Sequence, residues 1–124
     1  MLPTVTSGTV ANVLVDTDIF IDHLSGAQPL VPGKHRLAYS VVTRAELFAG
    51  TTATDAISQL LSPFRELPID RAVAERAGRI RRDTGVRPPA ALIAATALEH
   101  RMNLATRNDT DFKAVSGFRI RKLS

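Results

Sequence analysis

The chain has 124 residues, of which 44% are hydrophobic and 23% charged, a composition typical of one soluble globular domain rather than of a disordered segment. It contains no cysteine, which excludes disulfides and thiolate metal sites and is compatible with the cytoplasm. Sixteen Lys and Arg against twelve Asp and Glu give a formal net charge of +4, which favours a polyanionic partner.

The amino-terminal residues 1–11 are small and polar, and they predict a loose leader before a single domain at residues 12–124. This leader lacks the basic segment and apolar core of a signal peptide. No apolar run in the sequence approaches the length that is needed to span a bilayer, so no membrane association is expected.

Short apolar strands alternate with helices along the rest of the chain. Strands are predicted at residues 12–15, 36–40, 66–69, 103–106 and 118–121. Helices are predicted at residues 19–24, 43–50, 55–64, 71–84 and 90–102, with a short helical turn at 109–114. The helix at 90–102 is apolar nearly all round and is expected to be buried. This alternation predicts an α/β fold, in which helices cover both faces of a central parallel sheet of four or five short strands.

Acidic and amide side chains follow two of the predicted strands. Asp16 follows the first strand, and Asn108, Asp109 and Asp111 follow the fourth. Glu46 lies one turn into the helix after the second strand. Because ligands of such sheets bind beyond the carboxyl ends of the strands, we expect these side chains to reach one edge of the sheet.

Clustered carboxylates repel one another unless a cation joins them. Hard oxygen ligands, without cysteine or a histidine pair, favour Mg²⁺ or Mn²⁺ over zinc. Such an ion can activate water and stabilise a phosphoryl transition state. In a basic protein, this combination points to phosphodiester hydrolysis.

Three segments carry a resemblance to a known family: VLVDTDIFID, SVVTRAELFAG and ALIAATALEHRMNLATRNDTDF. Together they resemble PIN-domain ribonucleases, specifically the VapC toxins of bacterial toxin–antitoxin pairs, over nearly the whole chain after the leader. The resemblance implies a three-layer α/β/α PIN-like domain and a Mg²⁺-dependent endoribonuclease that cuts transfer or ribosomal RNA. It also implies a VapB-type antitoxin whose tail covers the site, and a homodimer within the toxin–antitoxin complex.

The resemblance also assigns site residues. Asp16 matches the first metal-binding acid of the family, and Glu46 matches the second acid. Asn108 stands where members have an acid or an asparagine, and Asp111 matches the acid that often accompanies the asparagine form. Residues that match supporting positions of the family are Ser40, Thr43, Thr106 and Arg107.

The residue at position 90 departs from the family pattern, which has an aspartate directly before the apolar helix. Ala90 stands there in this chain, and alanine cannot bind a metal. Either the natural protein has lost activity, or the residue was changed on purpose because an active toxin poisons the cell that expresses it. We favour the second interpretation because every neighbouring motif residue still fits.

Several residues have a simpler structural interpretation. Asp18 is interpreted as a helix cap, and Asp109 as a turn residue. The arginines of the helix at 71–84 are interpreted as a solvated face, with phosphate contact as the alternative. Six apolar residues are candidates for partner contacts or for the core: Ile21, Leu24, Leu47, Phe48, Leu60 and Leu61.

Two rival functions remain open from the sequence. The first is a non-catalytic PIN-like protein that binds RNA or antitoxin without cleavage, and Ala90 is its main support. The second is a deoxyribonuclease that uses the same acids. Helix-turn-helix DNA binding is disfavoured, because the alternation of strands and helices leaves little room for a helical trio.

Overall fold

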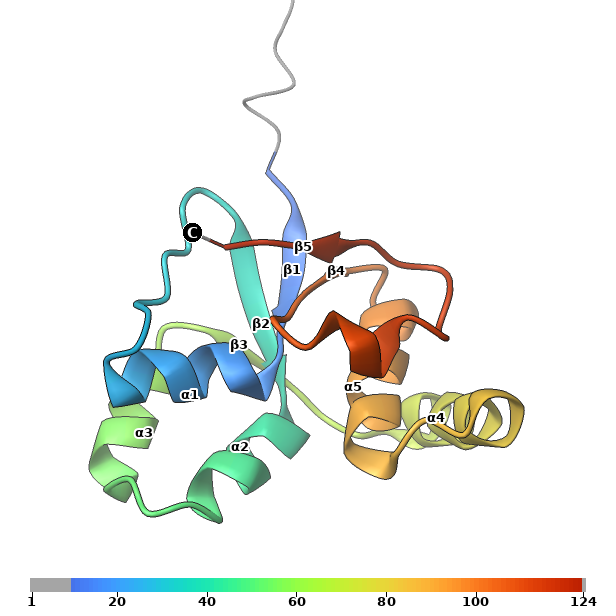
Figure 1. Ribbon diagram of the computed structural model, residues 1–124, viewed down its shortest axis with the longest axis horizontal. Helices are drawn as coiled ribbons and strands as arrows, with labels where there is room; N and C mark the ends of the chain where they lie inside the picture. Colours follow the sequence, from blue (N-terminus) through green and yellow to red (C-terminus); the bar gives the residue numbers. More distant parts are fainter. Residues whose placement is uncertain (1–9, 124) are drawn as a thin grey trace, which may run out of the picture.

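A computed structural model describes residues 10–123 of the chain, so most of the predicted leader lies outside the described residues. Five parallel strands form one sheet in the order β3-β2-β1-β4-β5 (Figure 1). The strands are β1 (Asn12–Val15), β2 (Arg36–Ser40), β3 (Arg65–Leu67), β4 (Asn103–Ala105) and β5 (Ile120–Arg121). The predicted parallel α/β sheet is therefore confirmed.

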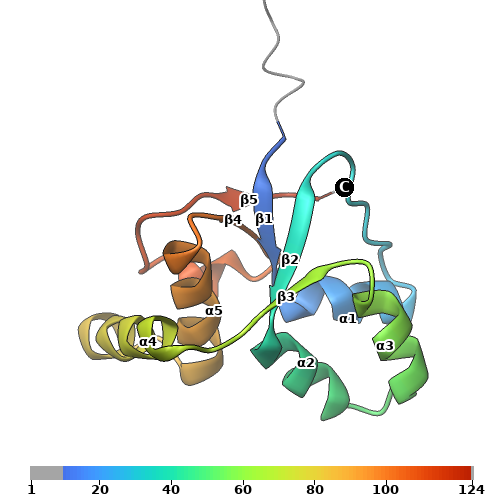
Figure 2. The same cartoon turned by 180° about the vertical axis from the view of Figure 1, so that it is seen from behind.

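Helices cover both faces of this sheet, which gives the predicted three layers (Figures 1 and 2). One face is covered by α1 (Thr17–Ser25), α2 (Val41–Phe48) and α3 (Thr54–Leu61). The other face is covered by α4 (Arg71–Thr84) and α5 (Pro88–Glu99). No helix among the described residues is long and apolar enough to cross a membrane.

The two cores follow from the alternation of side chains along the strands. Val13 and Val15 pack with α1, α2 and α3, whereas Leu14 between them packs with α4 and α5. Successive side chains of a strand point to opposite faces, so β1 is buried on both sides. Alanines of α5 are buried in the second core, which confirms that this helix is internal and lets it lie close to the sheet.

All predicted boundaries lie within three residues of those in the structure. The strands at 12–15 and 36–40 and the helix at 71–84 are correct to the residue. The helix predicted at 90–102 has the wrong limits: it starts at Pro88 and ends at Glu99. Its end comes early because Arg101 adopts a left-handed backbone with φ of 54°, which turns the chain toward β4.

The carboxyl edge of the sheet has a crevice beside β1. From β1 the chain moves outward to β2 and β3 on one side, and later to β4 and β5 on the other. Adjacent strands whose connections leave in opposite directions open a gap at their carboxyl ends, where ligands of α/β proteins bind. Asp16 and Thr106 follow β1 and β4 at this point.

Candidate active site

A small pocket of about 160 Å³ lies at the carboxyl edge of the sheet. It brings together the four acidic and amide residues that were predicted as catalytic, together with position 90. The pocket is lined by Asp16, Thr17, Asp18, Glu46, Pro89, Ala90, Ile93, Asn108, Asp111 and Phe112. We call this set the acidic pocket.

Asp16 is fixed at the base of the acidic pocket by two hydrogen bonds. It is the N-cap of α1, and its Oδ1 accepts a hydrogen bond from the Thr17 backbone N–H at 2.8 Å. The Thr106 hydroxyl donates to Asp16 Oδ2 at 2.7 Å across 90 residues of sequence. Asp16 can both cap α1 and belong to the site, because one carboxylate oxygen caps the helix while the other faces Thr106.

Burial raises the pKa of the Asp16 carboxyl from its ordinary value of 3.8 to about 6. The hydrogen bond from Thr106 acts against this rise, and the nearby carboxylates of Asp18 and Glu46 add to it. Asp16 as a residue is only 8% exposed, so water screens its charge little. A negative charge on Asp16 is therefore costly in the absence of a cation.

Glu46 joins the site through a chain of hydroxyl groups that starts in the core. The Thr17 hydroxyl donates to Glu46 Oε1 at 2.6 Å and lies 2.9 Å from the Thr43 hydroxyl. Since Thr17 has one hydroxyl proton and gives it to the carboxylate, Thr43 is the donor to Thr17. Thr43 has no exposed surface, so these two hydrogen bonds anchor the Glu46 side chain to the interior of the protein.

The chain of hydroxyls predicts that Thr17→Val lowers the free energy of unfolding by about 1–3 kcal/mol, because it leaves the buried Thr43 hydroxyl without its acceptor. Thr17→Ser keeps a hydroxyl at that position and is the matched control, expected to lose much less. Urea unfolding of the two variants measures the difference. A loss in Thr17→Ser with none in Thr17→Val would mean that the Thr17 methyl group, which valine keeps, and not its hydroxyl supports the fold.

Asp18 lines the acidic pocket, and its prediction as a helix cap is wrong. Asp16 is the cap, and Asp18 lies in the first turn of α1. Asp18 Oδ2 accepts from the Arg107 backbone N–H at 3.0 Å and lies 3.3 Å from the Thr106 hydroxyl. Its Oδ1 is buried and has no hydrogen-bond partner within residues 10–123.

Asn108 and Asp111 form the outer wall of the acidic pocket. The Asn108 side-chain amide donates to Asp111 Oδ2 at 2.8 Å, which fixes the amide orientation. Asp111 belongs to a 3-10 helix at Asp109–Phe112. Asp109 in the same helix does not line the pocket, in keeping with its interpretation as a turn residue.

Two of the supporting residues predicted from the sequence have their side chains outside the acidic pocket. Ser40 is the buried N-cap of α2, where its hydroxyl accepts a hydrogen bond from the Val42 backbone N–H at 3.0 Å. The Arg107 guanidinium pairs with Asp22 at 2.9 Å, and only the Arg107 backbone reaches Asp18. Thr43 and Thr106 contact the pocket residues Thr17 and Asp16, as described above.

The side chains of the acidic pocket offer the type of ligand that Mg²⁺ prefers, but too few of them lie close together to bind the ion. The pocket offers oxygen ligands, including the unpaired Oδ1 of Asp18, and no sulfur or imidazole. Yet no group of three or more acidic or histidine side chains within residues 10–123 lies close enough to hold a metal ion. Ala90 lines the pocket from the first turn of α5 and supplies no ligand.

Comparison with known proteins agrees with this architecture. A family model described as "PIN domain" matches residues 13–117. Comparison with curated protein sequences gave no match. Among solved structures, a toxin–antitoxin complex from Klebsiella pneumoniae is 30% identical, with a TM-score of 0.71 over 89% of this chain and 96% of that chain.

Two further solved structures extend the comparison. A member of the VapBC family of toxin–antitoxin systems from Mycobacterium tuberculosis is 30% identical, with a TM-score of 0.67 over 91% of this chain and 98% of that chain. DNA-bound VapBC from Salmonella typhimurium shares the fold, with a TM-score of 0.79 and 20% identity over 91% and 98% of the two chains. Because the family model matches residues 13–117, which are most of this chain, the chain belongs to the PIN domain family and is a PIN domain of the VapC type.

Proposed function

We propose that this chain is the toxin of a type II toxin–antitoxin pair, built as a Mg²⁺-dependent endoribonuclease and inactivated by Ala90. One observation carries the proposal. Asp16 and Glu46, which are 30 residues apart in sequence, line one small pocket, and Ala90 lines the same pocket where a third carboxylate would complete the set. Because the present residues do not complete a metal site, we assign no step of hydrolysis to the chain as it stands.

In a chain with aspartate at position 90, the pocket residues have distinct tasks. Asp16 is held in one orientation by Thr17 and Thr106, and Glu46 by the Thr17 hydroxyl. Asn108 and Asp111 stand at the mouth of the pocket, where they can orient the substrate or the attacking water. The ion itself would supply an activated water and neutralise charge that develops on the phosphate.

An antitoxin is the proposed protein partner, since the similar structures from Klebsiella and Mycobacterium are described as toxin–antitoxin systems. Of the six candidate contact residues, Leu47 and Leu61 are buried in the core and cannot serve. Ile21 on α1 is 50% exposed and Phe48 on α2 is 42% exposed. We assign these two to contacts with the antitoxin or with a second toxin copy, in a complex in the cytoplasm.

Incubation of the Ala90→Asp variant with total RNA and with DNA, each with Mg²⁺ and with EDTA, tests the proposed function. We expect cleavage of RNA only, with Mg²⁺ only, at a limited set of sites that sequencing of the products would identify. Equal cleavage of DNA would make the protein a deoxyribonuclease instead. If the folded variant cleaves neither RNA nor DNA, the proposed nuclease function is wrong.

Ala90 itself favours a second candidate function, a non-catalytic PIN domain that keeps its partner but does not cut RNA. The natural codon at position 90 separates the two proposals. An alanine codon, together with an inactive Ala90→Asp variant, would support the binding protein.

A further inference from the structure

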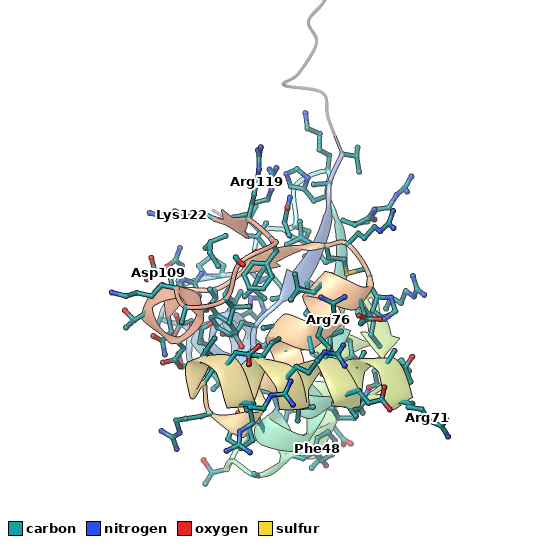
Figure 3. The ribbon with its side chains drawn as sticks, turned by 90° about the vertical axis from the view of Figure 1, so that its right-hand side faces the viewer. Phe48, Arg71, Arg76, Asp109, Arg119 and Lys122 are labelled. Carbon is teal, nitrogen blue, oxygen red and sulfur yellow. The ribbon has the colours of Figure 1, made fainter. Side chains whose placement is uncertain are left out.

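The amino-terminal edge of the sheet, at the opposite end from the acidic pocket, carries a row of arginines. Arg36 and Arg65 are the first residues of β2 and β3, while Arg101 and Arg119 stand just before β4 and β5. All five strands are parallel, so these four positions lie along one edge. We call them the basic edge. In Figure 3, Arg119 lies above Asp109, which belongs to the 3-10 helix that carries Asp111.

No salt bridge among residues 10–123 neutralises the positive charge of the basic edge. All four arginines are exposed, and none forms a salt bridge with a residue in the described range 10–123. The segments that form this edge, at 10–12, 32–36, 62–65, 100–103 and 115–120, contain no Asp or Glu. The acids next to them in sequence are already bonded, Glu66 to Arg44 and Glu99 to Arg76.

Two depressions lie along the basic edge and meet at Met102, which lines both. One of about 480 Å³ has Arg101, Arg119 and the half-buried Phe118 in its walls. The other, of about 440 Å³, is lined by Arg36, Arg65 and the half-buried Phe64 among others. Exposed arginines that line an open depression can contact successive phosphates of an RNA backbone.

The backbone at Arg101 turns the chain from α5 toward β4 and leaves the Arg101 side chain exposed on this edge. It is the one residue other than glycine with a positive φ, 54°, among residues 10–123. A side chain in this region strains the backbone, and glycine is the residue that ordinarily occupies such a position after a helix. The chain keeps a long basic side chain there, at an exposed site where it packs into no core.

We propose that the basic edge binds the phosphate backbone of a folded RNA while another part of that RNA reaches the acidic pocket. The choice of RNA as the ligand rests on the proposed function. The acidic pocket gathers the carboxylates of Asp16, Asp18, Glu46 and Asp111, which repel phosphate, so the affinity for RNA has to come from elsewhere. Strands about 4.8 Å apart spread this edge over roughly 19 Å, enough for several phosphates of one strand.

A binding experiment with two matched triple variants tests the proposal. The edge variant carries Arg36→Gln, Arg65→Gln and Arg119→Gln. The control carries Arg71→Gln, Arg79→Gln and Arg81→Gln, which removes the same charge from exposed positions of α4. The probe is a fluorescently labelled stem-loop RNA, bound in EDTA to the chain with Ala90, so that no cleavage interferes.

We expect the edge variant to lose about tenfold or more in affinity at low salt, and its slope of log K against log salt to fall by about 2. The α4 control should lose less than about a third as much. Arg101→Gly should weaken binding without lowering the melting temperature, which separates loss of contact from loss of fold. Equal losses in both triple variants, or none in the edge variant, would overturn the proposal.

Duplex DNA of the same sequence completes the design. DNA binding that is as tight as RNA binding, and equally sensitive to the edge variant, would contradict the assignment to RNA. Because binding is measured without metal, its result is independent of whether the Ala90→Asp variant cleaves RNA. A negative result at the basic edge is thus distinguishable from failure of the proposed nuclease function.

Discussion

Ala90→Asp is expected to raise the rate of Mg²⁺-dependent RNA hydrolysis at least about a hundredfold over the chain with alanine. Position 90 is half-buried, lines the acidic pocket and lies in the first turn of α5. The new carboxylate would therefore join Asp16 and Glu46 around one ion. A negative charge near a helix N-terminus is also favourable, and α5 has no acid in its first turn.

Ala90→Asn is the matched control, since it has the size of aspartate and can offer an oxygen but not a charge. We expect it to remain close to the rate of the Ala90 chain. Binding of the ion has a readout separate from activity: Mg²⁺ should raise the melting temperature of Ala90→Asp more than that of Ala90→Asn. Equal rates in all three proteins would show that position 90 lies outside the chemistry.

The sequence predicts the elements whose ends carry strong local signals. The helix at 71–84 is correct to the residue because Asp70 caps its start with a hydrogen bond to the Val73 N–H, and because Gly85 ends it with φ of 74°. Prolines suit the first turn of a helix, and Pro88 opens α5 two residues before the predicted limit at residue 90. Its end depends on Arg101, whose left-handed backbone no residue preference predicts.

The candidate site could be predicted only in part, for a physical reason. Asp16 and Glu46 were found because acids near the carboxyl ends of parallel strands converge whatever the details of packing. Thr17 and Asp18 were missed because their roles depend on contacts across 29 and 89 residues, with Glu46 and with the Arg107 backbone. A threonine after an acid, or a second acid in a first turn, has an ordinary local explanation.

Asp16→Asn is expected to stabilise the fold at neutral pH and not at acidic pH. The folded protein raises the pKa of Asp16 from 3.8 to about 6, so the folded state binds its proton more tightly than the unfolded state does. The stability from this proton is complete below about pH 4 and is lost as pH rises through 6. At pH 7 the loss is on the order of 3 kcal/mol, which asparagine would avoid.

The measurement is the free energy of unfolding by urea between pH 4 and pH 7.5, taken as the difference between Asp16→Asn and the parent. Asp55→Asn, at an exposed position in the first turn of α3, controls for the loss of one negative charge. A difference that stays constant with pH would mean that burial does not penalise the Asp16 charge. A difference that grows with pH would mean that the fold retains a destabilising carboxylate. A catalytic role would explain why the protein has this carboxylate. In the Ala90→Asp variant, a cation in the acidic pocket would offset the free-energy cost of ionising the buried Asp16, whereas the protein with Ala90 has no such compensation.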